Sequence, residues 1–582
     1  MQLSPSQVIV LATPVFFLAI AVEYAWGRAR GRDTYRLNDA INSISLGMLS
    51  EATGALLAVF RIGIYTALAG HIALWRDDAF WLSPAGWLLA LLFYDFCYYW
   101  QHRTGHRVGL FWAAHVVHHQ SQEYNLSTAL RQPSTYAFLN WMFYIPLALA
   151  GVPPLVFAVV ALVDLLYQFW VHTEHVGRLG WFDRWFCSPS NHRVHHAVND
   201  GYLDRNYGGI LIVWDRLFGT FREEGERCVY GTRAPLQSWD PLWSNLEVYW
   251  ALAHDSWHAR SWADKLRVWF KPPGWRPADV AERFPRPAFA LERVARFHPP
   301  MGKGVAWFAG VQFAVILWGV ALFLWNADQM PLARAGMWLA AVTAALWAVG
   351  AVMQGRISVL EVLLVEAAAL ATATAAEGWI DAHRVFKPLA MLLAIAWVAR
   401  RRQGRFAGVL VAALALCLAG DVFLMFDGFF IPGLASFLAA HLCYLLLFRQ
   451  GVPWFPSARA LAATLAVAAA MYAVLFPHLG PVLKVAVAAY AVAIALMAAQ
   501  AIGRAAVLRD GAAIGVAVGA VLFMASDAIL AINKFAQPVP LAPLWILATY
   551  YAAQVLIVHN AQPAGGAAAL TRRTGSRPAA AA

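Results

Sequence analysis

The sequence predicts an all-α, polytopic membrane protein with about fifteen transmembrane or membrane-embedded helices in two domains. Two observations carry this prediction. Of the 582 residues, 60% are hydrophobic and only 13% are charged, and 27 are tryptophan. A soluble core cannot bury that much apolar surface. The apolar residues also gather in stretches of about 20, which is the length that crosses a bilayer as a helix.

The expected spans fall unevenly along the chain. Five lie in the first half, at 8–26, 45–69, 80–100, 134–151 and 154–171. Ten lie in the second half, at 305–325, 335–353, 357–376, 385–399, 406–426, 430–448, 460–477, 481–501, 511–532 and 541–559. Arg61 lies inside the second span, so a re-entrant hairpin is an alternative there. The first span has neither a basic n-region nor a small-residue cleavage site, and we expect it to be retained.

The polar stretches between the spans divide the chain. We expect a first domain at 1–304, whose residues 172–304 form a Trp-rich cytosolic cap and linker. Connecting transmembrane helices follow at 305–356, and a second domain follows at 357–559. The Ala, Gly, Pro and Arg composition of 560–582 predicts a disordered tail.

The net charge of +11 is concentrated in loops. Arginines follow the first span (28, 30, 32 and 36) and the ninth span (400, 401, 402 and 405), and strict alternation places these loops on one side of the membrane. Short cytoplasmic loops collect such residues, so the pattern predicts topology and argues against nucleic-acid binding. The Ala/Arg-rich composition favours a bacterial inner membrane. The five cysteines are scattered, and we expect no disulfides.

Histidines cluster in the first half. Three groups stand out: His102 and His106; His115, His118 and His119; and His192, His195 and His196. Residues three and four apart share a helix face, so each group directs two or three imidazoles the same way. A lone histidine such as His71 is more simply an interfacial residue. Three tight groups on the predicted cytoplasmic side indicate metal binding.

The number of imidazoles indicates the metal. Zinc is usually satisfied by four ligands, whereas eight or more imidazoles suit two ions with five or six positions each. Imidazole ligation with open positions suits iron that activates oxygen. Soluble di-iron bundles use Glu-x-x-His pairs, and this chain has none. The sequence therefore predicts an all-histidine, membrane-associated site for two iron ions.

Further polar residues lie near these groups. His172 and His175 follow the fifth span and are expected as additional ligands. Asp95 and Glu174 are candidates for carboxylates that orient imidazole N–H groups, with a plain interfacial charge as the alternative. The segment 123–132 offers side chains that could bind a polar head group or a cofactor: Asn125, Ser127, Arg131 and Gln132. A loop that merely braces the ligand helices is an equally good interpretation.

Four charged or titratable residues interrupt the apolar spans of the second half, where such residues are costly and usually functional. They are Lys387, Asp421, His441 and Asp527. Strict alternation places Lys387, Asp421 and Asp527 at similar depth, towards the face opposite the histidines. Two carboxylates in a low-dielectric site favour one protonated general acid and one ionised partner. Pairing with Lys387 to fix packing is the alternative.

Several motifs of the first half carry a resemblance. They are "DFCYYWQHRTGH" (95–106), "NLSTALRQ" (125–132), "LLYQFWVHTE" (165–174), "PSNHRVHH" (189–196) and "DRNYGGILIVWDRLFGTF" (204–221). From about residue 35 to 275 the chain resembles the fatty acid hydroxylase/sterol desaturase superfamily and, within it, the alkylglycerol monooxygenases. The resemblance implies a tetrahydrobiopterin-dependent, di-iron oxygenation by O2 of the carbon beside the ether oxygen of alkylglycerols, which releases a fatty aldehyde. It implies iron ligation by the histidine groups, His115, His118 and His119 among them, and a reductase or pterin-recycling partner. By their position, Asn125, Arg131, Gln132 and Glu174 are the candidates for contacts with the cofactor.

Other motifs carry a second resemblance. "KPLAMLL" (387–393), "GDVFLMF" (420–426), "FLAAHLCY" (437–444), "SDAILAINKF" (526–535) and "YYAAQVLI" (550–557) resemble the YhhN-like lysoplasmalogenases, over about 357–559. These enzymes hydrolyse the vinyl ether bond of lysoplasmalogens. The resemblance implies catalysis by Asp421 and Asp527, with His441 and Lys387 and with a supporting set: Ser526, Asn533, Tyr551 and Gln554.

Together the two halves predict a bifunctional enzyme that cleaves ether lipids. An alternative for the first half is a sterol or fatty acyl hydroxylase or desaturase that uses the same iron site with another electron donor. An alternative for the second half is a lipid-binding or transport module, although matched broken helices typical of transporters are not evident.

Overall fold

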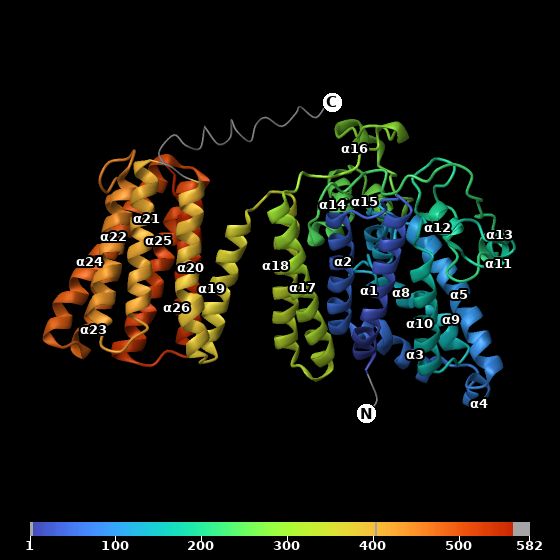
Figure 1. Ribbon diagram of the computed structural model, residues 1–582, viewed down its shortest axis with the longest axis horizontal. Helices are drawn as coiled ribbons and strands as arrows, with labels where there is room; N and C mark the ends of the chain where they lie inside the picture. Colours follow the sequence, from blue (N-terminus) through green and yellow to red (C-terminus); the bar gives the residue numbers. More distant parts are fainter. Residues whose placement is uncertain (1–3, 402–403, 563–582) are drawn as a thin grey trace. The chain divides into compact units, whose positions relative to one another are not determined.

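The computed structural model describes residues 4–401 and 404–562, whose regular secondary structure is helical (Figure 1). Most of the tail expected at 560–582 therefore lies outside the described residues. The chain divides into two compact units, of which the first ends at Ile357 and the second begins at Ser358. Across the described residues, extended pairing is limited to two isolated β-bridges, Phe186 with Leu211 and Ala197 with Tyr230.

The first unit contains α1 to α18. Their bounds are α1 (Pro5–Ala29), α2 (Leu37–Leu56), α3 (Ile64–Ile72), α4 (Asp78–Trp81), α5 (Pro84–Arg107), α6 (Gly109–His115), α7 (Leu126–Ala129), α8 (Ala137–Asn140), α9 (Ile145–Leu149), α10 (Pro154–Trp170), α11 (Phe182–Trp185), α12 (Pro189–His196), α13 (Val213–Leu217), α14 (Pro241–His258), α15 (Trp262–Phe270), α16 (Ala278–Arg283), α17 (Lys303–Asn326) and α18 (Leu332–Met353). α17 and α18, which the sequence indicated only as connecting helices, pack on α2 through one apolar core within this unit.

Eleven helices among the described residues are long and apolar enough to cross a membrane: α1, α17, α18 and the eight of the second unit. This confirms the polytopic membrane fold. The four remaining expected spans differ for identifiable reasons. A π-helical turn at Val59–Gly63 divides the span at 45–69, and the one at 134–151 breaks into short helices. α10 has 17 residues, and α5 is long enough but carries Asp95, His102 and His106. Of these four, α5 carries His102 and His106, and α10 leads directly into His172.

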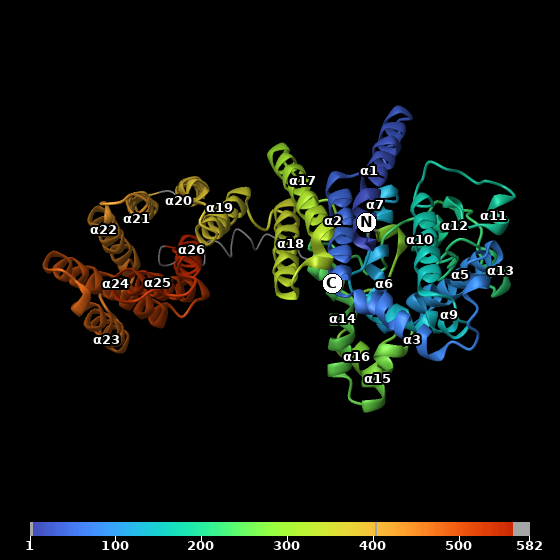
Figure 2. The same cartoon turned by 90° about the horizontal axis from the view of Figure 1, so that it is seen from below.

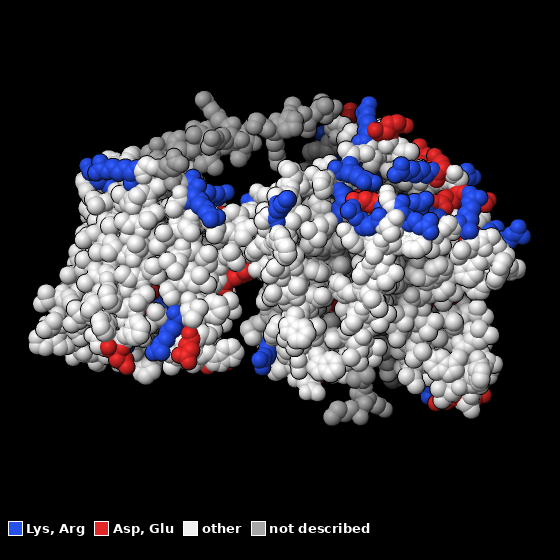
Figure 3. All heavy atoms as spheres, in the orientation of Figure 1, with Lys and Arg blue, Asp and Glu red and all other residues white. Residues whose placement is uncertain are grey.

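The polar segment 172–304 lies towards one end of the helices of the first unit (Figure 1). There α12 and α13 contact α5, and α14 and α15 pack on α6. On the face drawn in Figure 3, most Lys, Arg, Asp and Glu side chains gather towards the ends of the helices, and a broad belt between them is uncharged. Such a belt is the surface that a lipid-embedded protein presents to hydrocarbon.

The second unit contains eight helices: α19 (Val359–Ala376), α20 (Ile380–Arg401), α21 (Arg405–Phe423), α22 (Phe430–Arg449), α23 (Ala458–Leu475), α24 (Pro481–Leu508), α25 (Gly511–Ala531) and α26 (Ala542–Asn560). Neighbouring helices pack in the order α19, α20, α21, α22, α24, α25 and α26, and α26 returns to α19. Seven helices thus form a closed ring, visible in Figure 2, and α23 packs against α24 outside it. One apolar core fills the ring.

Candidate functional site

Short, buried segments at the end of the first unit position the histidines. His102 and His106 lie on the last turns of α5, and His115 ends α6. A 3-10 turn over Val116–His119 carries the next pair, His118 and His119. The remaining ligand candidates are His172, just after α10, and the three histidines of α12, His192, His195 and His196. Ser188 caps α12 by accepting from the Asn191 backbone N–H, so a short helix is fixed where it must present three imidazoles.

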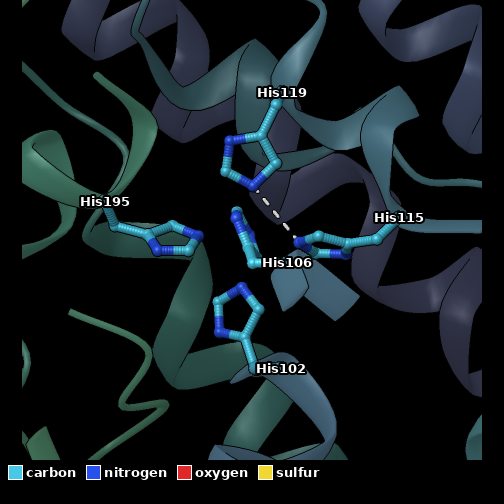
Figure 4. Close-up of side chains that lie close together, drawn as sticks. All are labelled: His102, His106, His115, His119 and His195. Atoms are coloured by element: carbon cyan, nitrogen blue, oxygen red, sulfur yellow. Dashed lines mark hydrogen bonds between the residues drawn. The ribbon is translucent and has the colours of Figure 1, made fainter. Parts of the chain in front are cut away.

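The structure brings nine histidines together in two groups. The first group contains His102, His106, His115, His119 and His195, which point towards a common centre (Figure 4). The second contains His118, His172, His192 and His196. Within each group the ligand nitrogens lie within 4.8 Å of one another, and every member is buried. The two groups are in direct contact, because the His119 ring of the first stacks on the His196 ring of the second with 4.3 Å between ring centroids.

Hydrogen bonds at Nδ1 set the orientation of four of these rings. His102 Nδ1 lies 2.8 Å from the Tyr207 carbonyl oxygen, and His118 Nδ1 lies 2.9 Å from that of Arg131. His172 and His195 make the same contact with the carbonyl oxygens of Gln168 and Arg205, at 2.7 and 3.1 Å. A carbonyl only accepts, so Nδ1 carries the proton and Nε2 keeps its lone pair. Such contacts typically orient metal-binding histidines.

In the four-histidine group the Nε2 atoms face one another at short range, and those of His118 and His172 both carry lone pairs. The Nε2 atoms of His118 and His172 are 3.2 Å apart, as are those of His172 and His192 and those of His192 and His196. In the other group, the Nε2 atoms of His102, His106 and His195 are buried without a hydrogen-bond partner. Lone pairs directed at one another would repel. A metal about 2.1 Å from each nitrogen separates adjacent ligands by about 3.0 to 3.4 Å, so these donors fit a metal in each group.

Burial also prepares the imidazoles for ligation. It lowers the pKa of His118 to about 4. Burial and the neighbouring histidines hold the pKa values of His119 and His196 well below the usual range. The rings are therefore neutral near pH 7, and neutral imidazole is the form that binds metal.

The other residues named from the sequence lie around these groups and not in them. His175 stands apart, with Nε2 3.2 Å from the Thr34 hydroxyl, and no contact joins Glu174 to the nine histidines among the described residues. Arg131 donates to the Val117 carbonyl and, at 2.8 Å, to Asn42. Asn125 donates to the Thr34 carbonyl and Gln132 to that of Ala129. These three side chains thus contact the ligand loops and the neighbouring backbone.

Asp95 holds in place the loop whose Tyr207 carbonyl orients His102. Its carboxylate accepts from the backbone N–H groups of Ile210 and Leu211, at 2.7 and 3.0 Å, and from the Trp214 indole. A Cβ on Gly209 would lie 2.6 Å from an oxygen of Asp164, so only glycine lets the loop approach this closely. The same loop supplies the Tyr207 carbonyl that orients His102.

Sequence reasoning missed Glu23, near the end of α1. Its buried carboxylate accepts from Tyr35, from the Thr173 hydroxyl and, at 2.8 Å, from the Leu126 N–H. Thr173 adjoins His172, and Leu126 begins the helix that leads to the Arg131 carbonyl. Glu23 thus ties together the segments that hold two ligands of the four-histidine group. The only signal was an acidic residue at the end of an apolar span.

The polar residues of the second unit meet inside the ring as two neighbouring sets. Lys387 Nζ lies 3.3 Å from Asp421, which also accepts from Tyr550 at 2.6 Å. His441 Nε2 lies 2.9 Å from the Tyr490 hydroxyl, and Tyr490 donates to Asp527. Phe523 separates the sets, with its ring 4.8 Å from that of His441 and 5.4 Å from that of Tyr550. Tyr490 and Tyr550 were not among the expected residues.

The expected supporting residues have structural contacts. Ser526 donates to the Ile546 carbonyl at 2.9 Å, and Asn533 accepts from the Val539 N–H. Gln554 accepts from Tyr444, and the Tyr551 hydroxyl lies 3.4 Å from the Lys387 carbonyl. These contacts fix helices of the ring, and Tyr550, the neighbour of Tyr551, is the tyrosine that reaches a carboxylate.

Comparison with known proteins agrees with this division. The fatty acid hydroxylase family matches residues 87–220. An alkylglycerol monooxygenase of Homo sapiens is 41% identical over 316 residues, covering 53% of this chain and 68% of the relative. One of Xenopus tropicalis is 36% identical over 320 residues, covering 54% of this chain and 70% of the relative. This chain belongs to the alkylglycerol monooxygenase family.

This alkylglycerol monooxygenase homologue carries a second enzyme domain. The YhhN family matches residues 382–561. A lysoplasmalogenase of Homo sapiens is 34% identical over 184 residues, covering 31% of this chain and 76% of the relative, so the second unit belongs to that family. No solved structure matches the chain. Both resemblances inferred from the sequence are confirmed, and the protein is a two-domain ether-lipid enzyme.

Proposed function

We propose that the first unit holds two iron ions and uses O2 to hydroxylate the ether carbon of alkylglycerols. The observation that carries this proposal is the convergence of nine buried imidazoles in two groups, among which the Nε2 atoms of His102, His106 and His195 have no hydrogen-bond partner. The five histidines around His106 would hold one iron, and the four around His172 the other. Bound iron supplies the activation of oxygen. One oxygen atom enters the C–H bond, the other leaves as water, and the resulting hemiacetal separates into fatty aldehyde and glycerol product.

The residues of this chain would hold and shield that site. The backbone carbonyls at Nδ1 keep the rings in one tautomer, and burial keeps them neutral and excludes water. Tetrahydrobiopterin is the electron donor that the resemblance implies. The described contacts of Asn125, Arg131 and Gln132 are structural, so the donor's binding residues are not assigned to them.

The second unit would hydrolyse the vinyl ether of lysoplasmalogens. Protonation of the alkene carbon gives an oxocarbenium ion, water adds to it, and the hemiacetal separates into a fatty aldehyde and a glycerophospho head group. Asp527 is the better proton donor of the two aspartates, since its side chain is 21% exposed beside His441, whereas that of Asp421 is 3% exposed and paired with Lys387. Tyr490 and His441 would position Asp527 and return its proton.

The setting of both sites would be a bacterial inner membrane, with the histidines at the cytoplasmic face. Arg28, Arg30 and Arg32 lie at the end of α1 that leads towards the histidine site, and basic residues favour the cytoplasmic side.

An aldehyde-release assay on the purified full chain tests both activities. One sample receives 1-O-alkylglycerol with iron, O2 and tetrahydrobiopterin, and the other receives lysoplasmalogen without O2. We expect His118→Ala to abolish only the first activity and Asp527→Asn only the second. Exposed residues provide the controls, His71→Ala and Asp427→Asn. If alkylglycerol yields no aldehyde, the first assignment fails and sterol or fatty acyl hydroxylation is tested next.

A further inference from the structure

The segment 172–304 contains a helical hairpin, α14 and α15, that exposes an apolar face. Every exposed residue of α14 is apolar, whereas its buried residues include Ser244, Asn245 and Asp255. The large exposed side chains of this helix are Leu242, Trp243, Leu246, Trp250 and Trp257. A helix on the surface of a soluble protein turns its polar face outwards, so α14 is the reverse of a helix built for water.

The second helix of the hairpin, α15, continues this face. Lys265 joins the two helices, because its ammonium donates to the Ser256 and Trp257 carbonyls at 3.0 and 2.8 Å. Side chains four residues apart share one side of a helix. Three large side chains of α15 have this spacing and are 81%, 66% and 62% exposed: Trp262, Leu266 and Phe270. Contiguous apolar surface of this kind marks a contact with a membrane or with another protein.

The start of α14 is fixed to the end of a membrane span. Asp240 caps α14 by accepting from the N–H groups of Leu242 and Trp243, at 2.9 and 3.0 Å. The same carboxylate accepts from the Trp347 indole at 3.1 Å. Trp347 lies near the end of α18, which is long and apolar enough to cross a membrane. Figure 1 shows α14 and α15 at the level where α18 ends, and in Figure 2 they extend to one side of the spans of the first unit.

We propose that the α14–α15 hairpin is embedded in the lipid leaflet on the side of the histidine site, with its apolar face against the acyl chains just below the phospholipid head groups. Tryptophan is enriched at this depth of a bilayer, and both helices expose it. Arg260 and Lys271 are exposed at the two ends of α15, where they would meet phosphate groups. The level of the hairpin, its tryptophans and its basic ends together favour lipid over a protein partner.

The inner face of α14 connects the hairpin to the histidine site. α14 packs on α6, which ends at His115. Gln120, directly after His119, donates to the Ser244 carbonyl at 3.0 Å. Embedding α14 would therefore set the depth of the neighbouring histidines in the membrane. The inference is independent of the reactions proposed above, because it concerns only where the hairpin lies.

Fluorescent labels on single introduced cysteines test the depth of the hairpin in the full chain. Trp250→Cys and Trp262→Cys are labelled with an environment-sensitive fluorophore in nanodiscs of phosphatidylcholine and phosphatidylglycerol. We expect a blue-shifted emission that a nitroxide near the lipid head group quenches and aqueous iodide does not. Val315→Cys, on the exposed side of α17, is the control for lipid, and Glu282→Cys, exposed on α16, is the control for water. The unsubstituted chain gives the background from the native cysteines.

Two outcomes of the labelling would overturn the inference. Quenching of both hairpin labels by iodide, to the extent seen for Glu282→Cys, would place the face in water. Shielding from both quenchers would mean that protein covers the face, and a pair of chains in each nanodisc would identify that protein as a second copy.

A photoactivatable phospholipid provides a check without any substitution. In the unsubstituted chain we expect lipid adducts on the exposed residues of 242–257 and 262–270, as on α17, and none on α16. Adducts on α17 without adducts on the hairpin would contradict the proposal.

Discussion

The two polar sites differ in how their buried polar groups are satisfied. In the first unit, nine buried imidazoles converge in two groups, and the Nε2 atoms of His102, His106 and His195 have no hydrogen-bond partner. In the second unit, Lys387 faces Asp421, and Tyr490 bridges His441 and Asp527, so most of the polar groups satisfy one another. We therefore expect the first site to depend on a bound metal for its stability, and the second to depend mainly on hydrogen bonds and the ion pair within the protein.

Metal removal should give the largest difference between the two units in stability and activity. Chelation of the full chain is expected to lower the stability of the first unit by more than about 3 kcal/mol, the amount that a ligand at a hundred times its Kd contributes. Alkylglycerol cleavage should vanish while vinyl ether hydrolysis persists. Metal content, both activities and thermal unfolding check this. A parallel loss of both activities would contradict it.

The buried ion pair tests the second unit. Lys387→Met leaves the Asp421 carboxylate buried without its cation and should destabilise the unit by about 3–5 kcal/mol. The double variant Lys387→Met/Asp421→Asn removes both charges, keeps an acceptor for Tyr550 and should recover most of that loss. Arg384→Met is the control on the same helix, since its pair with Asp381 is exposed and worth less than about 1 kcal/mol. Additive effects of the two single changes, measured by chemical unfolding, would argue against a shared pair.

Glu23 tests how far the metal site depends on its surroundings. Glu23→Gln weakens the contacts to Thr173 and to the Leu126 N–H and should lower metal affinity about 10- to 100-fold, as is usual when partners of ligands are lost. The change is read as metal bound per chain during a chelator titration. Glu223→Gln, an exposed residue paired with Arg178, should leave the titration curve in place. Equal curves for both variants would mean that Glu23 does not position the ligands.

His175 should give the smallest effect. Because its ring contacts Thr34 and not the two groups, His175→Ala is expected to keep the full metal content and to change stability by less than about 0.5 kcal/mol. His172→Ala, three residues earlier, should lose metal from the four-histidine group. Loss of one metal ion in His175→Ala would mean that His175 is a metal ligand, as the sequence predicted.

The sequence predicted the members of both sites better than their arrangement. Spacings of three and four residues indicated that His115, His118 and His119 share a face, yet the structure assigns His118 to one group and its two neighbours to the other. That division depends on how α12 and the end of α10 pack against the 3-10 turn at Val116–His119. The spacing of residues within one segment does not encode this packing. Glu23 and Tyr490 escaped detection for a similar reason. A single polar residue in an apolar helix has a function only through its tertiary partners.

The closed helix ring of the second unit also constrains the order in which that unit can be made. α19 is synthesised first and α26 last, yet the two pack against each other. Lys387 and Asp421 are inserted early, but Tyr550, which donates to Asp421, comes from the final helix. Until α26 is inserted, the ring is open and the ion pair lacks Tyr550. Such late, long-range closure slows folding, so ribosome-bound intermediates that lack α26 should be the species most exposed to membrane quality control.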